Sequence, residues 1–137
     1  MVDAAPETVF DYMTDASNLR DWQTSKTSVE VLTDGPPGLG TRIRERTKPP
    51  VLKEFEQIVE FTEFERPRRL HVHIVEGPQP IDGTWTLEPD GAGTKVVFVA
   101  AGKLRGPTRL IAPVIQRAMA REFAGYHRNL CRNVGRV

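Results

Sequence analysis

Two glutamates are the residues of this 137-residue sequence that could do chemistry most directly. Glu45 alternates in phase with Ile43 in a strand-like segment, and we take that row as facing the interior. An interior carboxylate can act as a general acid or base, or hold a ligand hydroxyl. In the alternative, which we favour, the strand ends near Glu45 and its carboxylate reaches water or pairs with an arginine.

Glu122 falls on the apolar side of a helical pattern, between Met119 and Phe123. A carboxylate in that position is costly unless it has a partner. No basic residue stands three or four positions away, which argues against an ion pair within the helix. Two interpretations stay open: Glu122 binds or protonates a ligand, or it lies at a boundary where it reaches solvent or an arginine of a strand.

His71 and His73 share one face of a strand, as two metal ligands or a proton-relay pair would. Their face alternates with an apolar row, however, so we expect both rings to point to solvent, and no third ligand stands at a recognisable spacing. His127 is likewise expected at the surface. Cys131, late in the helical pattern, is expected to be a small half-buried residue. We therefore predict no metal and no cofactor.

Composition places the chain among globular proteins with one domain, spanning residues 1–137. Apolar residues make up 39% of it, mean hydropathy is -0.39 and the net charge is +1, so the whole carries no strong bias toward nucleic acid or membrane. A single cysteine cannot form an internal disulfide, and no apolar stretch approaches the roughly 18 residues of a membrane span. We expect a cytoplasmic monomer or homodimer with no stable membrane association.

Changes in the spacing of apolar residues along the sequence indicate the helices and strands that must position the two glutamates. Pro6 begins a short helix, and a second short helix ends at Trp22. From Val29 onward, apolar residues alternate in about six segments separated by turn residues, which indicates a meander of antiparallel strands. From Leu110 to Val134 the period is helical, and this long amphipathic helix must meet the sheet. The class is α+β.

Arginines occupy the opposite side of the last helix, at Arg117, Arg121, Arg128 and Arg132. Such a face could serve an interaction module that binds RNA or anionic lipid. It lacks the interleaved aromatic residues of a base-stacking surface, and acidic strand faces elsewhere could neutralise it. We therefore favour a solvated face and predict no nucleic-acid partner.

Five short motifs resemble those of the helix-grip superfamily, also called START-like or birch-pollen-allergen-like, and within it the polyketide cyclase/dehydrase-like (SRPBCC) family. They lie at Asp3–Tyr12, Asn18–Trp22, Pro37–Arg42, Gly83–Pro89 and Gly93–Phe98. The resemblance implies a curved sheet wrapped around the C-terminal helix, with a cavity between them. Only Met1 to Ala4 precede the turn into the first helix, so we expect the leading strand to be very short or missing.

Members of that superfamily bind lipids, sterols, polyketides, quinones or plant hormones, and some cyclise or dehydrate polyketides. We accordingly expect this chain to bind or carry a small hydrophobic or aromatic molecule in a cavity of roughly a few hundred Å³ or more. The alternative is a cyclase or dehydratase that uses Glu45 or Glu122, so the sequence leaves open whether the protein is an enzyme. The residues expected to contact the ligand are Trp22, Ile43, Glu45, Phe55, Gln57, Val59, Trp85, Phe98, Met119, Glu122, Phe123 and Tyr126.

Overall fold

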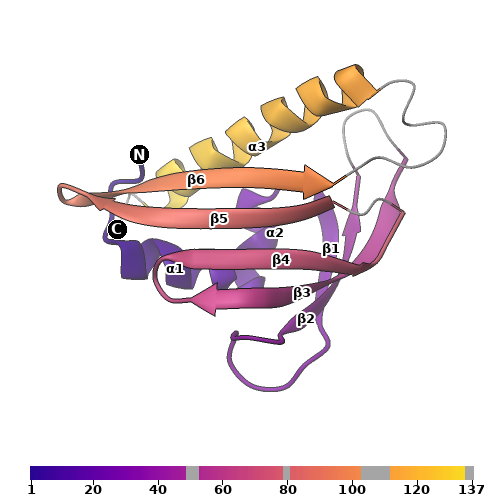
Figure 1. Cartoon of the computed structure of the whole chain (residues 1–137), viewed down its shortest axis with the longest axis horizontal. Helices are drawn as coiled ribbons and strands as arrows, with labels where there is room; N and C mark the ends of the chain where they lie inside the picture. The colour runs from indigo at the N-terminus through magenta and orange to yellow at the C-terminus, as the bar shows by residue number, and fades with distance from the viewer. Residues whose placement is uncertain (49–52, 79–80, 103–111, 135–137) are drawn as a thin grey trace.

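A six-stranded antiparallel sheet with its strands in chain order forms one layer of the fold (Figure 1). The structure is a computed structural model that describes residues 1–48, 53–78, 81–102 and 112–134. The order of the strands in the sheet confirms the predicted meander. The strands are β1 (Lys26–Val31), β2 (Arg42–Thr47), β3 (Phe55–Glu65), β4 (Arg69–Glu76), β5 (Ile81–Asp90) and β6 (Gly93–Gly102).

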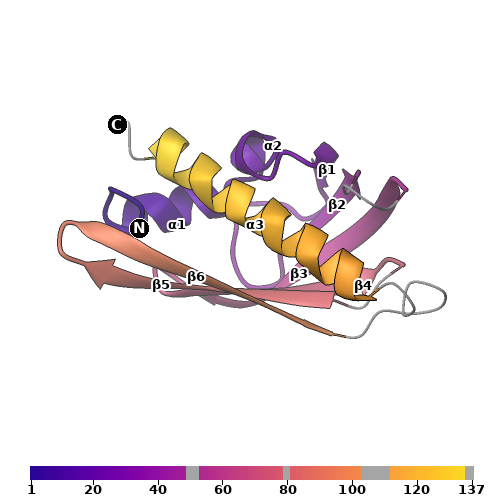
Figure 2. The ribbon, with the colours of Figure 1, turned by 90° about the horizontal axis from the view of Figure 1, so that it is seen from above.

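Two short helices precede the sheet, as predicted: α1 (Pro6–Thr14) and α2 (Leu19–Trp22). Pro6 opens α1, where its missing N–H removes no helical hydrogen bond. A 3₁₀ turn, η1 (Ala16–Asn18), joins the two helices, and Asp15 Oδ1 caps it by accepting from Ser17 N at 3.0 Å. These helices close one end of the concave face of the sheet (Figure 2).

The segment before α1 adds a single bridge to the sheet rather than a full strand. Val2 N donates to Thr94 O and Thr94 N donates to Val2 O, both at 2.8 Å. Val2 and Thr94 are completely buried. The very short leading strand that the sequence predicted is thus paired with β6.

The outer faces of β1, β2 and β3 carry the charged rows. Arg42 pairs with Glu60 at 2.7 Å, Arg44 with Glu30 at 3.2 Å, and Arg46 with Glu54 at 3.5 Å. The arginine row of β2 therefore lies beside acidic side chains on both of its sides. Because most of these side chains are well exposed, each pair adds little stability, and their main effect is on strand register.

The long helix α3 (Ala112–Val134) crosses the concave side of the sheet (Figure 2). Of the predicted helix, Leu110 and Ile111 lie outside the described residues. Burial increases along α3: Val114 is 58% exposed, whereas Leu130 and Val134 are 1% and 2% exposed. The C-terminal half, next to α1 and α2, therefore holds the helix in place, while its middle stands away from the sheet.

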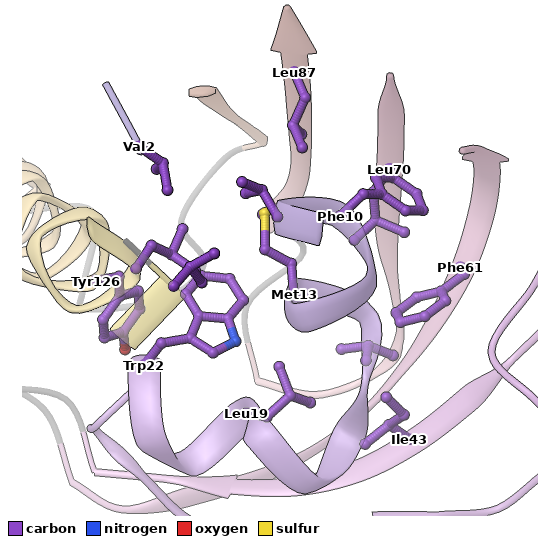
Figure 3. Packing of buried hydrophobic residues seen from close by; sticks show 14 residues of the cluster. Val2, Phe10, Met13, Leu19, Trp22, Ile43, Phe61, Leu70, Leu87 and Tyr126 are labelled. Carbon is purple, nitrogen blue, oxygen red and sulfur yellow. The ribbon is translucent and has the colours of Figure 1, made fainter. Parts of the chain in front are cut away.

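The core lies under that C-terminal half. Phe10 and Met13 of α1, Trp22 of α2, and Leu130 of α3 are all at most 2% exposed and belong to one apolar cluster. Figure 3 shows these side chains converging from the short helices, the strands and α3. Burial of each large apolar side chain contributes roughly 1.5–3 kcal/mol.

Removal of the Leu130 side chain tests this anchor. We expect Leu130→Ala to lower the free energy of unfolding by about 2–5 kcal/mol, because a completely buried leucine leaves a cavity behind. The exposed Arg121→Ala on the same helix is the matched control and should change it by at most about 0.5 kcal/mol. Urea unfolding followed by circular dichroism measures both, and equal losses would contradict the assigned anchor.

Candidate ligand cavity

A cavity of about 190 Å³ lies between the inner face of the sheet, α2 and α3. Its wall is mainly apolar and aromatic. All twelve residues that the sequence predicted to contact a ligand lie in this wall: they come from α2, β2, β3, β5, β6 and α3. The volume is smaller than the few hundred Å³ expected. Whether these residues bind a ligand stays a prediction.

Twelve further residues of the wall were not among those predicted. The wall residues on β4 alternate with His71 and His73, so the sequence could have shown that they face inward. The wall residues that precede β1 or lie on it show no such alternation. The twelve residues are Met13, Leu19, Gln23, Lys26, Thr47, Phe61, Leu70, Val72, Ile74, Ile81, Asp82 and Gly83.

Glu45 lies inside the cavity wall and is held by two donors. Lys26 Nζ donates to its Oε1 at 3.0 Å, and Gln57 Nε2 donates to the same oxygen at 2.6 Å. The Glu45 and Lys26 side chains are only 5% and 10% exposed. The interpretation that we favoured, in which Glu45 reaches water or an arginine, is therefore wrong: β2 continues to Thr47, and the partner is a lysine of β1.

Glu122 has a partner on its own helix. The Tyr126 hydroxyl, one turn later, donates to Glu122 Oε1, and Ser25 Oγ hydrogen-bonds the same phenol oxygen. Burial, together with the bond to Glu122, raises the pKa of Tyr126 far above its ordinary value. Tyr126 is therefore a neutral donor at physiological pH. The sequence contained this contact as an i, i+4 spacing, but a search for basic partners alone missed it.

Two buried polar atoms in the wall have no hydrogen-bond partner among the described residues. They are Trp22 Nε1 and Thr47 Oγ1. The two residues are 1% and 7% exposed. Figure 3 shows the indole nitrogen on the ring edge turned toward Met13 and Leu19, and both of these also line the cavity. A buried N–H without an acceptor is destabilising, and a ligand oxygen could satisfy it.

Five aromatic rings of the wall form a closed series of contacts. Centroid distances run from 4.3 Å, for Trp85–Phe98 and Phe98–Phe123, to 6.2 Å, for Trp22–Tyr126. Gly83 permits this packing, since a Cβ there would lie 2.7 Å from the Phe98 ring. The result is an aromatic surface that can contact a planar ligand on several sides.

His71 and His73 lie outside the cavity, on the outer face of the sheet. Both bond Asp82: His71 Nε2 lies 3.3 Å from Oδ2, and His73 Nδ1 lies 3.0 Å from both oxygens. Burial opposes the ionisation of Asp82, but the bonds from His73 and the N–H of Ile74 keep its pKa below its ordinary value. Within the described part of the chain, no three His, Cys, Asp or Glu side chains are arranged to hold a metal.

The remaining candidates do not line the cavity. Arg117, Arg121, Arg128 and Arg132 are exposed on α3, on the side away from the cavity. Cys131 is half-buried, as predicted. His127 is half-buried rather than exposed, and burial lowers its pKa. No helix in the described ranges is long and apolar enough to cross a bilayer.

Comparison with known proteins decides the family. The family described as "Polyketide cyclase / dehydrase and lipid transport" matches residues 1–135, almost the whole chain. The chain belongs to this family. The predicted resemblance to the helix-grip, or START-like, superfamily is thus confirmed. A search of curated protein sequences finds no match.

Solved structures of other proteins share the fold of this chain. A protein from Thermus thermophilus, TTHA0849, is 26% identical, with a TM-score of 0.84, over 97% of this chain and 91% of that one. The Zhui aromatase/cyclase from Streptomyces sp. R1128 is 13% identical, with a TM-score of 0.75, over 98% and 89% of the two chains. A START superfamily protein from Mycobacterium smegmatis is 16% identical, with a TM-score of 0.75, over 97% and 91%. The helix-grip fold is therefore common to proteins of diverse sequence.

The buried ion pair of the cavity wall predicts a strong asymmetry between single and double substitutions. Lys26→Met should lower the free energy of unfolding by about 3–5 kcal/mol, because it leaves Glu45 buried without its cation. The double variant Lys26→Met, Glu45→Leu should lose much less. Arg44→Met, which breaks an exposed pair with Glu30, should lose at most about 1 kcal/mol. Urea unfolding compares the three, and equal losses for Lys26→Met and Arg44→Met would show that water reaches Glu45.

Proposed function

We propose that the protein binds and carries a small hydrophobic or aromatic molecule in the cavity between its sheet and α3. The observation that supports this most is the wall itself, in which aromatic and aliphatic side chains from five strands and three helices line the cavity. Apolar burial would supply most of the affinity, at about 25 cal/mol for each Å² removed from water. A few polar groups would set the orientation.

The polar groups gather on the side of the cavity formed by β1, β2 and β3, facing the middle of α3. Lys26, Glu45 and Gln57 contribute one cluster, and Glu122 with Tyr126 contributes the other. The opposite side, on β4, β5 and β6, is apolar and aromatic. A ligand with one polar end would therefore bind in one direction, with that end toward β1–β3.

The family description includes lipid transport, which agrees with a carrier whose ligand is lipid, polyketide or quinone-like. A carrier needs reversible binding and no reacting group. We further propose that it works in the cytoplasm, as its single cysteine suggests, with neither nucleic acid nor a stable membrane contact as a partner.

Filling the cavity should abolish carriage without unfolding the protein. In Val72→Phe, the added ring volume enters the cavity from β4, so a hydrophobic molecule that co-purifies with the wild type should be lost, and added ligand should bind at least about tenfold more weakly. Val75→Phe, at an exposed position of the same strand outside the wall, is the control and should keep the ligand. Native mass spectrometry of freshly purified protein measures occupancy. A wild-type protein that carries nothing and binds no sterol, fatty acid or polyphenol would overturn the proposal.

A second candidate function is a cyclase or dehydratase reaction on a polyketide-like substrate. It is favoured by the burial of Glu45 beside a lysine, because a fixed carboxylate and ammonium within one cavity can exchange protons with a bound substrate. The Zhui aromatase/cyclase shares the fold at 13% identity.

Amide substitutions separate the two functions. If the carboxylates catalyse a reaction, Glu45→Gln or Glu122→Gln should reduce turnover about 100-fold or more while substrate still binds. If the protein is a carrier, the wild type shows no turnover of polyketide-like substrates, and the variants change ligand affinity alone. Single-turnover assays with product detection by mass spectrometry make the distinction, and Glu56→Gln on the exposed face is the control.

A further inference from the structure

The size of the cavity suits a single substituted ring. A cavity of about 150 Å³ is known to hold benzene, and this one measures about 190 Å³. One substituted ring therefore fits, and a longer ligand would extend out of this space. This step, like those below, rests on the proposed binding function.

The charges of the cavity wall do not cancel. Lys26 is neutralised by Glu45, 3.0 Å away. Glu122 lines the same cavity, and across the residues that the structure describes, no lysine, arginine or histidine nitrogen lies within 4.0 Å of its carboxylate. The remaining acidic residue of the wall, Asp82, turns its carboxylate to His71 and His73 on the outer face. The interior thus carries one carboxylate without a cation among the described residues.

That carboxylate shares the cavity wall with aromatic rings. Tyr126, one turn later on α3, donates to it, and Phe123 lines the same wall. Both rings belong to the closed series with Trp22, Trp85 and Phe98. The faces of aromatic rings attract cations, most strongly where water is excluded. A carboxylate and aromatic rings in one cavity wall can together bind an organic cation.

We propose that the ligand of this cavity is a small aromatic amine, whose ammonium group lies against Glu122 and whose ring stacks within the five aromatic side chains. The ammonium would replace the missing cation and donate a charge-assisted hydrogen bond to Glu122. A ligand carboxylate is disfavoured in the same place, because Glu122 would repel it and Lys26 is already paired. A neutral alcohol can bond Glu122 but gains no ionic attraction.

Three probes with one ring and different head groups test this proposal: 2-phenylethylamine, 2-phenylethanol and phenylacetate. Isothermal titration of the whole 137-residue chain at pH 7 should give the tightest binding for the amine, by about tenfold over the alcohol, and the weakest for the acid. Glu122→Gln should remove the preference of the amine over the alcohol. The exposed control, Glu56→Gln, removes the same charge from the surface and should leave the ranking unchanged.

The outcomes separate this proposal from the function on which it rests. Tightest binding of the acid, equal binding of amine and alcohol, or an amine preference that survives in folded Glu122→Gln would overturn the aromatic amine. If all three probes fail but native mass spectrometry finds another hydrophobic ligand, the amine is excluded and carriage stands. If no ligand of any kind is found, both fail. The wild-type ranking decides the question even if the variant does not fold.

Discussion

The position of α3 relative to the sheet is the constraint on which the cavity depends. Leu130 and Val134 pack among α1, α2 and the core, so the C-terminal half of the helix is held firmly. Toward the other end, Val114 is exposed and Met119 is only half-buried. A helix fixed at one end and crossing a curved sheet cannot contact the sheet along its whole length, so space remains under its middle. The short helices thus create the cavity as much as the strands do.

The sequence predicted the fold and much of the cavity wall because both depend on periodicity. Alternation assigned Ile43, Glu45 and Gln57 to one row, and helical spacing assigned Met119 and Phe123 to the inner side of α3. These assignments require only that each element keep its regular geometry. The family resemblance then supplied the way in which sheet and helix combine.

The spacing of residues along the sequence could not show which side chains bond the two glutamates. Lys26 meets Glu45 because β1 pairs with β2 through a shifted register, in which Lys26 lies opposite Thr47 while Ser28 lies opposite Arg46. Such an irregularity has no clear mark in the sequence. The volume of the cavity was also overestimated, since it depends on how far α3 stands from the strands and not on which residues face inward.

The composition of the cavity wall argues for an occupant. Larger side chains at half-buried positions such as Val72 or Ile74 would fill more of the space and bury more apolar surface. Two buried polar atoms, Trp22 Nε1 and Thr47 Oγ1, lack partners within the described part of the chain, which is destabilising. A wall that keeps both the space and the unpaired atoms is poorly suited to stability alone, and a bound molecule with a polar group would bury the apolar surface and bond such an atom at once.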